Sequence, residues 1–189
     1  MKTENPRVKR TKGYLKEALI ELLQKTAFED ITIKSICQKA SVNRSTFYAY
    51  YTCPRDLIEE IEKDIISRLP DYSPNNHKPF FESIVKFMEY IKENGDTFRI
   101  LLSSSIDRSF GEQIITAVID KYDEFATLQS QEEKEMSFIY VINGVVGLVR
   151  QWIAEDFRMS VDRISKLVID MSFRSVGLNP SDAYKVKIS

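Results

Sequence analysis

Apolar residues recur every three to four positions along most of this chain, which is the spacing expected of amphipathic helices. The clearest case is a stripe at i, i+3, i+4 and i+7 formed by Ile33, Ile36, Cys37 and Ala40. Only six glycines and six prolines occur among the 189 residues, and alternation of apolar and polar positions is rare. The pattern therefore predicts an all-α protein.

Two short helices joined by a tight turn are predicted between residues 31 and 57. Thr32 and Asn43 stand where their side-chain oxygens can cap the starts of these helices. Ser41 and Val42 form the turn, and Val42 is expected to be the apolar plug between the two helices.

The second of these helices predicts a binding surface. Phe47 and Tyr51 lie four residues apart, so both are expected to face the core. The outward side then carries Arg44, Ser45, Thr46 and Tyr48. A short, firmly held helix that exposes such residues is typical of a helix-turn-helix that reads DNA. The alternative is a helical hairpin with a solvated polar face.

Over residues 13–65 the chain resembles the DNA-binding head of TetR/AcrR-type transcriptional regulators. The resemblance rests on the spacing from Ile36 to Val42, the Arg-Ser-Thr-Phe-Tyr run at residues 44–48, and Thr32, Tyr51 and Leu57. It implies an N-terminal three-helix head of the helix-turn-helix type. It also implies that base edges are contacted by Lys34, Arg44, Ser45 and Thr46, and phosphates by Thr32 and Tyr48.

The sequence departs from the family pattern in three places, one of which is the high number of tyrosines, at residues 48, 50 and 51. Such turns usually have glycine where Ser41 stands, because glycine adopts a left-handed conformation without strain. The usual cap and phosphate-binding lysine are replaced by Cys53 and Pro54, and proline has no N–H to donate. We expect Arg55 to take over this phosphate contact, and Tyr50 joins the candidate DNA-binding residues.

Charge is unevenly divided along the chain. Residues 1–55 carry eleven Lys or Arg and five Asp or Glu, a net charge of +6, whereas the whole chain has a net charge of −1. A basic head would orient the protein on double-stranded DNA. A basic arm before the first helix is expected either to contact DNA or to act as a solubilising terminus, and its members are Lys2, Arg7, Lys9, Arg10 and Lys12.

Four regions are expected along the chain. They are a head with its arm at residues 1–55, a connecting helix at 56–69, a linker loop at 70–79, and a helical dimerisation and effector-binding domain at 80–189. The first helix is expected at residues 7–25, where it would bury Leu15, Leu19, Leu22 and Leu23. Helices of the body are expected at residues 80–93, 96–103, 110–128, 132–157 and 161–176, with stops at Asn94-Gly95 and at Gly177.

The helix at residues 132–157 is apolar on every side in its middle, so all of its faces must be covered. Gly144 and Gly147 permit close approach of another helix. We expect this helix and the last one to pair with their copies in a two-fold homodimer, the last helix contributing Ile164, Leu167, Val168 and Met171. The alternative places both stripes in the core of one subunit. Residues 144–152 also resemble the matching helix of a TetR/AcrR branch that includes regulators of dihydroxyacetone kinase genes.

Other classes of protein fit the sequence poorly. Two cysteines and one histidine predict neither a disulfide framework nor a metal site. Catalytic and cofactor-binding motifs are not recognisable, so an enzyme is not expected. The longest apolar run, residues 138–149, is short for a membrane span and the N-terminus is polar, which favours a soluble cytoplasmic protein. Cys53, at a helix start, is either structural or a redox switch.

These observations predict a dimeric, sequence-specific transcriptional regulator that binds a near-palindromic operator. We expect a repressor that a small effector releases. The aromatic residues of the body either line a pocket for a small apolar or aromatic effector or fill the core. The alternative function is an adaptor or co-activator that is anchored on DNA and docks a protein partner through its body.

Overall fold

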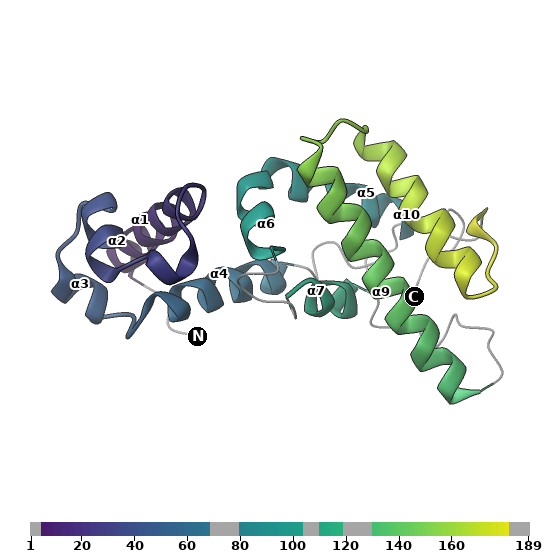
Figure 1. The fold of residues 1–189 in the computed structure, drawn as a ribbon, viewed down its shortest axis with the longest axis horizontal. Coiled ribbons are helices and arrows are strands. Elements are labelled where there is room, and N and C mark those ends of the chain that lie inside the picture. Colours follow the sequence, from purple (N-terminus) through teal and green to yellow (C-terminus); the bar gives the residue numbers. More distant parts are fainter. Residues whose placement is uncertain (1–4, 69–79, 104–109, 119–129, 182–189) are drawn as a thin grey trace. The chain divides into compact units, whose positions relative to one another are not determined.

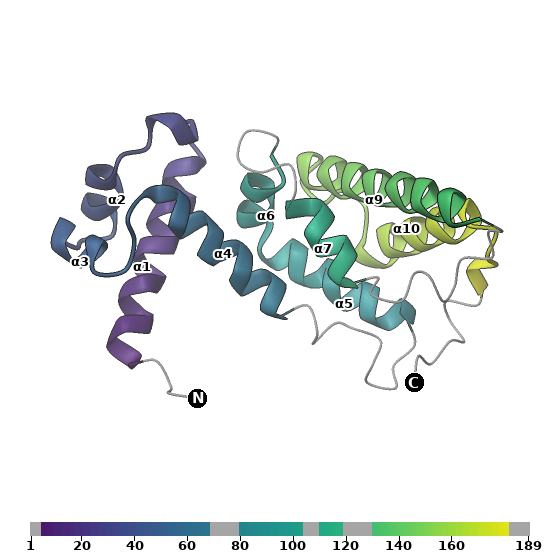
Figure 2. The same cartoon turned by 90° about the horizontal axis from the view of Figure 1, so that it is seen from below.

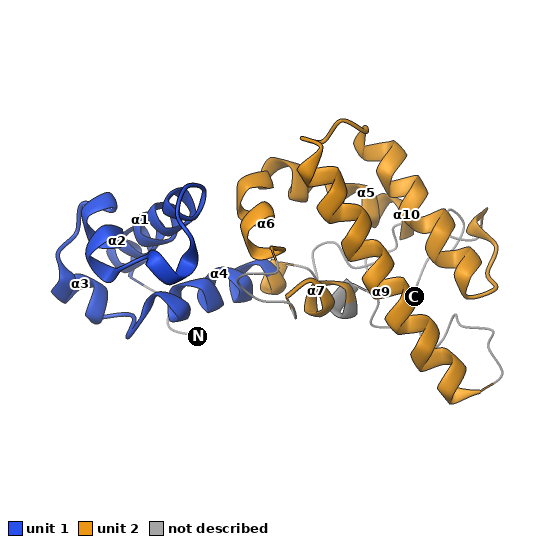
Figure 3. Ribbon diagram, in the orientation of Figure 1, with its two compact units in different colours: residues 1–65 blue, residues 66–189 orange. Residues whose placement is uncertain are grey.

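The computed structural model describes residues 5–68, 80–103, 110–118 and 130–181, and these residues form nine α-helices and one short 3-10 helix (Figure 1). The chain divides into two compact units, residues 1–65 and 66–189 (Figure 3). The all-α prediction is confirmed for the described residues. The expected linker at residues 70–79 and the expected end of a helix at 119–128 lie outside them, and the four predicted regions stay a prediction.

The first unit is a bundle of short helices around one core. It contains α1 (Pro6–Leu23), η1 (Phe28–Asp30), α2 (Ile33–Lys39), α3 (Arg44–Tyr48) and most of α4 (Pro54–Arg68). α1 packs on α2, and α2 packs on α3. The fully buried side chains are Leu15, Leu19, Ile36, Phe47, Leu57 and Ile58.

Two of the leucines expected in this core are only half-buried. Leu22 and Leu23 lie in the last turn of α1, where the helix ends. Ala18 is buried in addition to Leu15 and Leu19, because it follows Leu15 by three positions on the same face.

α1 begins at Pro6, one residue before the expected start, and it contains four of the residues that were assigned to a basic arm, which corrects that prediction. Asn5 caps the helix by accepting a hydrogen bond from the backbone N–H of Arg7 at 3.0 Å. Pro6 takes the first helical position, which suits its fixed φ and its missing N–H. The expected arm residues therefore lie on the helix itself, namely Arg7, Lys9, Arg10 and Lys12. Lys2 lies outside the described residues.

Both predicted caps of the helix-turn-helix are confirmed. Thr32 Oγ1 accepts from the N–H of Ser35 at 3.1 Å, and Ser35 Oγ accepts from the N–H of Thr32 at 3.1 Å, which forms a capping box. Asn43 Oδ1 accepts from the N–H of Thr46 at 3.0 Å. In the turn between the helices Ser41 has a φ of 55°, the left-handed conformation that glycine adopts more easily.

The second unit contains α5 (Phe80–Glu93), α6 (Gly95–Leu101), α7 (Phe110–Val118), α9 (Gln131–Ala154) and α10 (Val161–Ser175). α10 packs on α5 and on α9, and α9 is also contacted by α6 and α7 (Figure 2). Aromatic rings join these helices: Phe98 meets Phe87 and Tyr90, and Phe80 meets Phe173 at 5.8 Å between ring centroids. Phe87 and Phe98 are buried, whereas Phe80, Tyr90 and Phe173 are half-buried.

α5 ends at Glu93, directly before the Asn94-Gly95 pair, as the sequence predicts. Gly95 is the first residue of α6. Packing explains the glycine, because a Cβ at this position would lie 2.7 Å from the ring of Phe157. Gly177, with a φ of 76°, does follow α10 in the expected left-handed conformation.

α9 buries one face in the second unit and exposes another. Val141, Ile142, Val146 and Val149 are buried, whereas Met136, Ile139 and Tyr140 are 54–66% exposed. A Cβ added to Gly144 or Gly147 would meet no atom within 4 Å. Among the described residues of this single chain, α9 therefore keeps an open face that combines apolar side chains with glycines.

The expected apolar stripe of α10 is divided between two environments. Ile164 and Val168 are buried, because α10 packs on α5 and α9. Leu167 is half-buried and Met171 is 50% exposed. Only the second pair remains accessible, so the prediction that all four residues pair with another subunit is wrong for Ile164 and Val168.

By length and composition α9 is the one described helix that could cross a membrane. Its 24 residues include a stretch with a mean hydropathy of 1.3, of which 28% is buried inside the chain. The apolar run at residues 138–149 is shorter than the helix that contains it, so length alone does not exclude a membrane span.

Candidate nucleic-acid interface

α3 presents its polar side to solvent, as its spacing predicts. Phe47 is fully buried and Tyr51 is 4% exposed. Arg44, Ser45 and Tyr48 are exposed and Thr46 is half-buried. The Tyr48 ring lies edge-on to the Phe47 ring, 5.9 Å between centroids, so a core residue orients a side chain that faces water.

The capping residue of α3 also holds the two hydroxyl side chains that follow it. Asn43 Oδ1 accepts a hydrogen bond from Thr46 Oγ1 at 2.6 Å and another from Ser45 Oγ at 2.8 Å. Together with the N–H of Thr46, three donors converge on one oxygen. The first turn of α3 is therefore rigid, and its hydroxyls are oriented before any ligand arrives.

α2 exposes two further residues that the sequence predicts to contact DNA. Lys34 is exposed, and Thr32 is exposed while its side chain caps α2. Lys39, at the end of α2, pairs with Glu21 of α1. Because α2 packs on α3, the structure brings Thr32 and Lys34 into the same unit as residues 44–48.

Tyr50 and Arg55 engage other elements of the head. Lys12 Nζ lies 5.9 Å from the centroid of the half-buried Tyr50 ring. The Arg55 guanidinium lies 5.1 Å from the centroid of the Phe28 ring in η1. Both contacts have cation–π geometry. The expected DNA contacts of these two residues stay a prediction.

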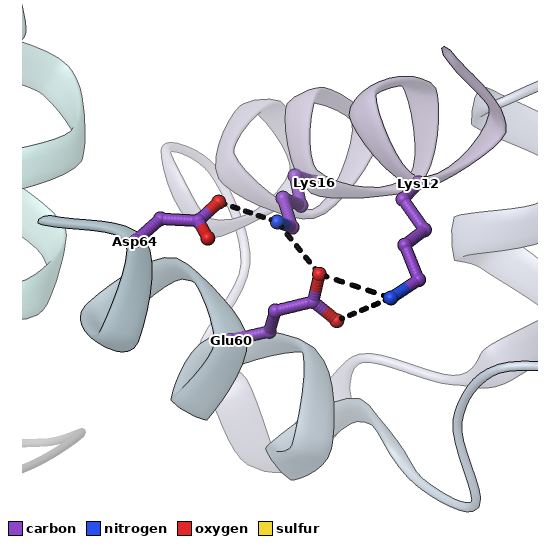
Figure 4. Close-up of polar contacts among 4 residues, drawn as sticks. All are labelled: Lys12, Lys16, Glu60 and Asp64. Carbon is purple, nitrogen blue, oxygen red and sulfur yellow. Dashed lines mark hydrogen bonds and ion pairs between the residues drawn. The ribbon is translucent and has the colours of Figure 1, made fainter. Parts of the chain in front are cut away.

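A network of ion pairs joins α1 to α4, and sequence reasoning missed it (Figure 4). Lys16 Nζ lies 3.0 Å from Glu60 Oε1 and 2.6 Å from Asp64 Oδ2. Lys12 Nζ lies 3.3 Å from both oxygens of Glu60. Lys12 and Lys16, like Glu60 and Asp64, are four residues apart, so each pair occupies one helix face. That spacing was the available signal, but it does not say which helices face each other.

Glu60 is the centre of this network. Burial by itself raises its pKa, but hydrogen bonds from Lys16 and Lys12 and the charge of Lys16 outweigh burial and lower the pKa overall. Lys12 and Lys16 are thus neutralised by carboxylates inside the head. This corrects the prediction for Lys12, whose charge is engaged by Glu60 and the tyrosine rings instead of extending in an arm.

The start of α4 is organised by Asp56. Its Oδ2 accepts from the N–H of Thr52 at 2.7 Å and from the Thr52 hydroxyl at 2.6 Å, and its Oδ1 lies 3.2 Å from Cys53 Sγ. These hydrogen bonds, led by that of the Thr52 hydroxyl, lower the pKa of Asp56 from 3.8 to about 2. Cys53 is half-buried with its thiol directed at a carboxylate, and a redox role for it stays a prediction.

α2 and α3 each begin at a capping residue, and α3 packs on the core through Phe47 while its polar side is exposed. This arrangement defines a helix-turn-helix protein. Residues 78–174, more than half of the chain, match the TetR family described as "Transcriptional regulator C-terminal region". The chain therefore belongs to the TetR family of transcriptional regulators. Members of this family bind DNA, act as dimers and are soluble cytoplasmic proteins, so a DNA partner and a homodimer follow from membership.

Solved structures share the fold. A TetR transcriptional regulator from Streptococcus agalactiae 2603V is similar with a TM-score of 0.70 and 21% identity, over 88% of this chain and 95% of that one. The dihydroxyacetone kinase operon activator DhaS is similar with a TM-score of 0.60 and 20% identity, over 88% of this chain and 96% of that one.

A sequence relative is the HTH-type transcriptional regulator YxbF of Bacillus subtilis (strain 168). It is 39% identical over 51 residues, which are 27% of this chain and 13% of that protein. The matched region thus spans about an eighth of the relative's length.

Proposed function

We propose that this chain is a sequence-specific repressor that binds a near-palindromic operator as a homodimer and leaves it when a small effector binds the body. The observation that carries the proposal is α3, on which Arg44, Ser45 and Tyr48 are exposed while Phe47 is completely buried. Arg44 is proposed to contact base edges together with Lys34, Ser45 and Thr46. Thr32 and Tyr48, with Tyr50 and Arg55, are proposed to contact phosphates.

The proposed dimer would let two copies of the head contact the two half-sites of the operator. Two copies of α3 must reach successive major grooves, roughly 34–36 Å apart, on one side of the duplex. The proposed interface is the open face of α9, with Ile139, Tyr140, Gly144 and Gly147, together with Leu167 and Met171 of α10. Burial of this face against its copy would cover the apolar side chains that one chain leaves exposed.

The proposed release of DNA by an effector requires a movement of α4. This helix runs from the head into the residues of the second unit, so a shift of α4 would change the separation of the two heads. A small apolar or aromatic effector suits a body rich in aromatic residues. Such an effector acts by binding one of two arrangements more tightly than the other.

A second candidate is an adaptor or co-activator that is anchored on DNA and docks a protein partner. The observation that favours it is Met136, an apolar side chain near the start of α9 that is 66% exposed and lies outside the proposed dimer face. DhaS, which has a similar fold, is described as an operon activator. A stable complex with the product of a neighbouring gene, and no response to small molecules, would support this function over repression.

The test is fluorescence anisotropy with the DNA upstream of the protein's own gene, with a shuffled duplex as control and a series of salt concentrations. Tight binding to the native duplex alone, weakening steeply with salt, supports a specific regulator. Equal weak binding to both duplexes would contradict specific recognition of that DNA and favour the adaptor. Repression is then tested with a reporter gene behind the bound sequence.

A further inference from the structure

We propose that Asn43 makes the hydroxyls of Ser45 and Thr46 act only as hydrogen-bond acceptors, so that α3 recognises exocyclic amino groups of bases in the major groove. This inference rests on the proposed function, because it needs DNA at α3. It adds the chemistry that two side chains of α3 read, and it assigns Asn43 as a residue that determines specificity without contacting DNA.

The polarity of the hydrogen bonds follows from the geometry at Asn43. The backbone N–H of Thr46 lies 3.0 Å from the side chain of Asn43 and can only donate. The atom that faces it must therefore be the amide oxygen and not the amide nitrogen. An amide oxygen has no hydrogen, so both hydroxyls that lie within 2.8 Å of it must donate.

Each hydroxyl has a single hydrogen, and in both residues that hydrogen points at Asn43. Only lone pairs remain for a ligand. Ser45 is exposed, and Thr46 is half-buried. A hydroxyl that turned outward to donate to DNA would lose its hydrogen bond to Asn43. Both hydroxyls therefore face DNA as hydrogen-bond acceptors.

The major groove offers two kinds of donor, the N6 amino group of adenine and the N4 amino group of cytosine. Guanine O6 and N7, adenine N7 and thymine O4 are acceptors and would face the same lone pairs without a hydrogen between them. A freely rotating hydroxyl tolerates either kind of group. Arg44, the neighbouring residue, carries only donors and suits the guanine acceptors. Adjacent positions of α3 would then read opposite hydrogen-bond polarities.

The first step of the test is selection of binding sequences from random duplexes by the wild-type protein. Base pairs read by the hydroxyls are those whose preference disappears in Ser45→Ala or in Thr46→Val. At these pairs adenine is replaced by purine, or cytosine by 2-pyrimidinone, either of which removes the amino group. We expect the wild type to lose about three- to tenfold in affinity, the size of one hydrogen bond, and the variant lacking that hydroxyl to lose nothing further.

The second step removes the hydrogen-bond acceptor, the side-chain oxygen of Asn43. Asn43→Gly keeps most of the capping effect but eliminates the acceptor, so the hydroxyls can rotate. Discrimination between the best and worst base pair at these positions should fall by about three- to tenfold. Asn43→Asp keeps acceptor-only oxygens, so it should retain the base preference while binding all DNA more weakly. Ser160→Gly, which removes the corresponding cap of α10 in the body, is the matched control and should leave the preference unchanged.

The outcomes distinguish failure of the proposed function from failure of the proposed role of Asn43. A wild-type protein that selects no sequence contradicts the proposed function itself. A wild-type protein that selects a sequence, but loses no affinity when the amino groups are removed, overturns the role of Asn43 and leaves the proposed function intact. The same conclusion follows if Asn43→Gly discriminates between base pairs as sharply as the wild type.

Discussion

Lys16 on α1 and Glu60 on α4 lie 3.0 Å apart, measured from Nζ to Oε1, and their ion pair joins the first helix of the head to the helix that leaves it. Lys12 and Asp64 extend the pair into a network whose lysine side chains are only 19–22% exposed. Partial burial reduces the screening that makes most surface ion pairs weak. The network therefore fixes α1 and α4 as one piece of the head.

Replacement of Glu60 tests this role. Glu60→Gln removes the charge that both lysines share, so we expect the head to lose roughly 0.5–1 kcal/mol of stability. Hydrogen exchange of the α1 amides and urea unfolding measure the loss. The control is Glu59→Gln, because Glu59 lies 3.9 Å from Lys63 in an exposed pair on the same helix and should have almost no effect. Equal losses in the two variants would contradict a special role for Glu60.

Asp56 predicts a dependence of stability on pH. Its pKa in the folded chain is about 2, lowered from 3.8, so folding favours the ionised carboxylate. A lowered pKa means that this contribution is fully present above the unfolded value and is lost as pH falls toward the folded value. We expect Asp56→Asn to be less stable at neutral pH and to lack this part of the decline between roughly pH 4 and pH 2.

Urea unfolding of both proteins across this pH range measures the difference. Asp162→Asn, which changes an exposed acid in the first turn of α10, is the matched control for the loss of one negative charge. Parallel curves for the wild type and Asp56→Asn would show that the hydrogen bonds from Thr52 do not stabilise α4.

Arg44→Ala tests the proposed base contact. Loss of a bidentate arginine should cost on the order of 1–3 kcal/mol at the preferred operator and relax the preference at one position. Tyr48→Phe should instead weaken binding to all sequences, because a phosphate contact carries no sequence information. Lys39→Ala is the control, since Lys39 is paired with Glu21. Binding to sets of single-base operator variants distinguishes these effects, and unchanged specificity in Arg44→Ala would remove this residue from the proposed interface.

Gly144→Ala tests the proposed dimer face. Alanine in place of a helical glycine stabilises an isolated helix by about 1 kcal/mol, and among the described residues no atom outside the local helix backbone lies within 4 Å of the new methyl group. If a second copy packs there, the methyl group should instead weaken self-association by about tenfold, measured by sedimentation equilibrium. Gly13→Ala in α1 is equally unobstructed and should leave self-association unchanged. Tighter or equal association of Gly144→Ala would place the interface elsewhere.

The local features of the head were predictable because they depend on residues close in sequence. The caps at Thr32 and Asn43 need only a side-chain oxygen three positions before a backbone N–H. Burial of Phe47 and Tyr51 follows from helical spacing within one turn. The left-handed turn at Ser41 was expected from its place between two helices, although the sequence puts serine there.

Features that join distant segments could not be predicted in the same way. The pairing of Lys16 with Glu60 and the contact between Gly95 and Phe157 depend on how helices pack, which periodicity does not specify. The division of the α10 stripe has the same origin, since Ile164 and Met171 look alike in sequence but face different neighbours.

The sequence by itself determined that this chain is helical, where the short helices α2 and α3 begin, and which side of α3 is polar. Each of these features depends on residues that lie within a few helical turns of one another. Only the tertiary structure decided which charges are neutralised inside the head and which face of α9 stays open. Those outcomes depend on distances between atoms in three dimensions, and hydrogen bonds and ion pairs act only over a few ångströms.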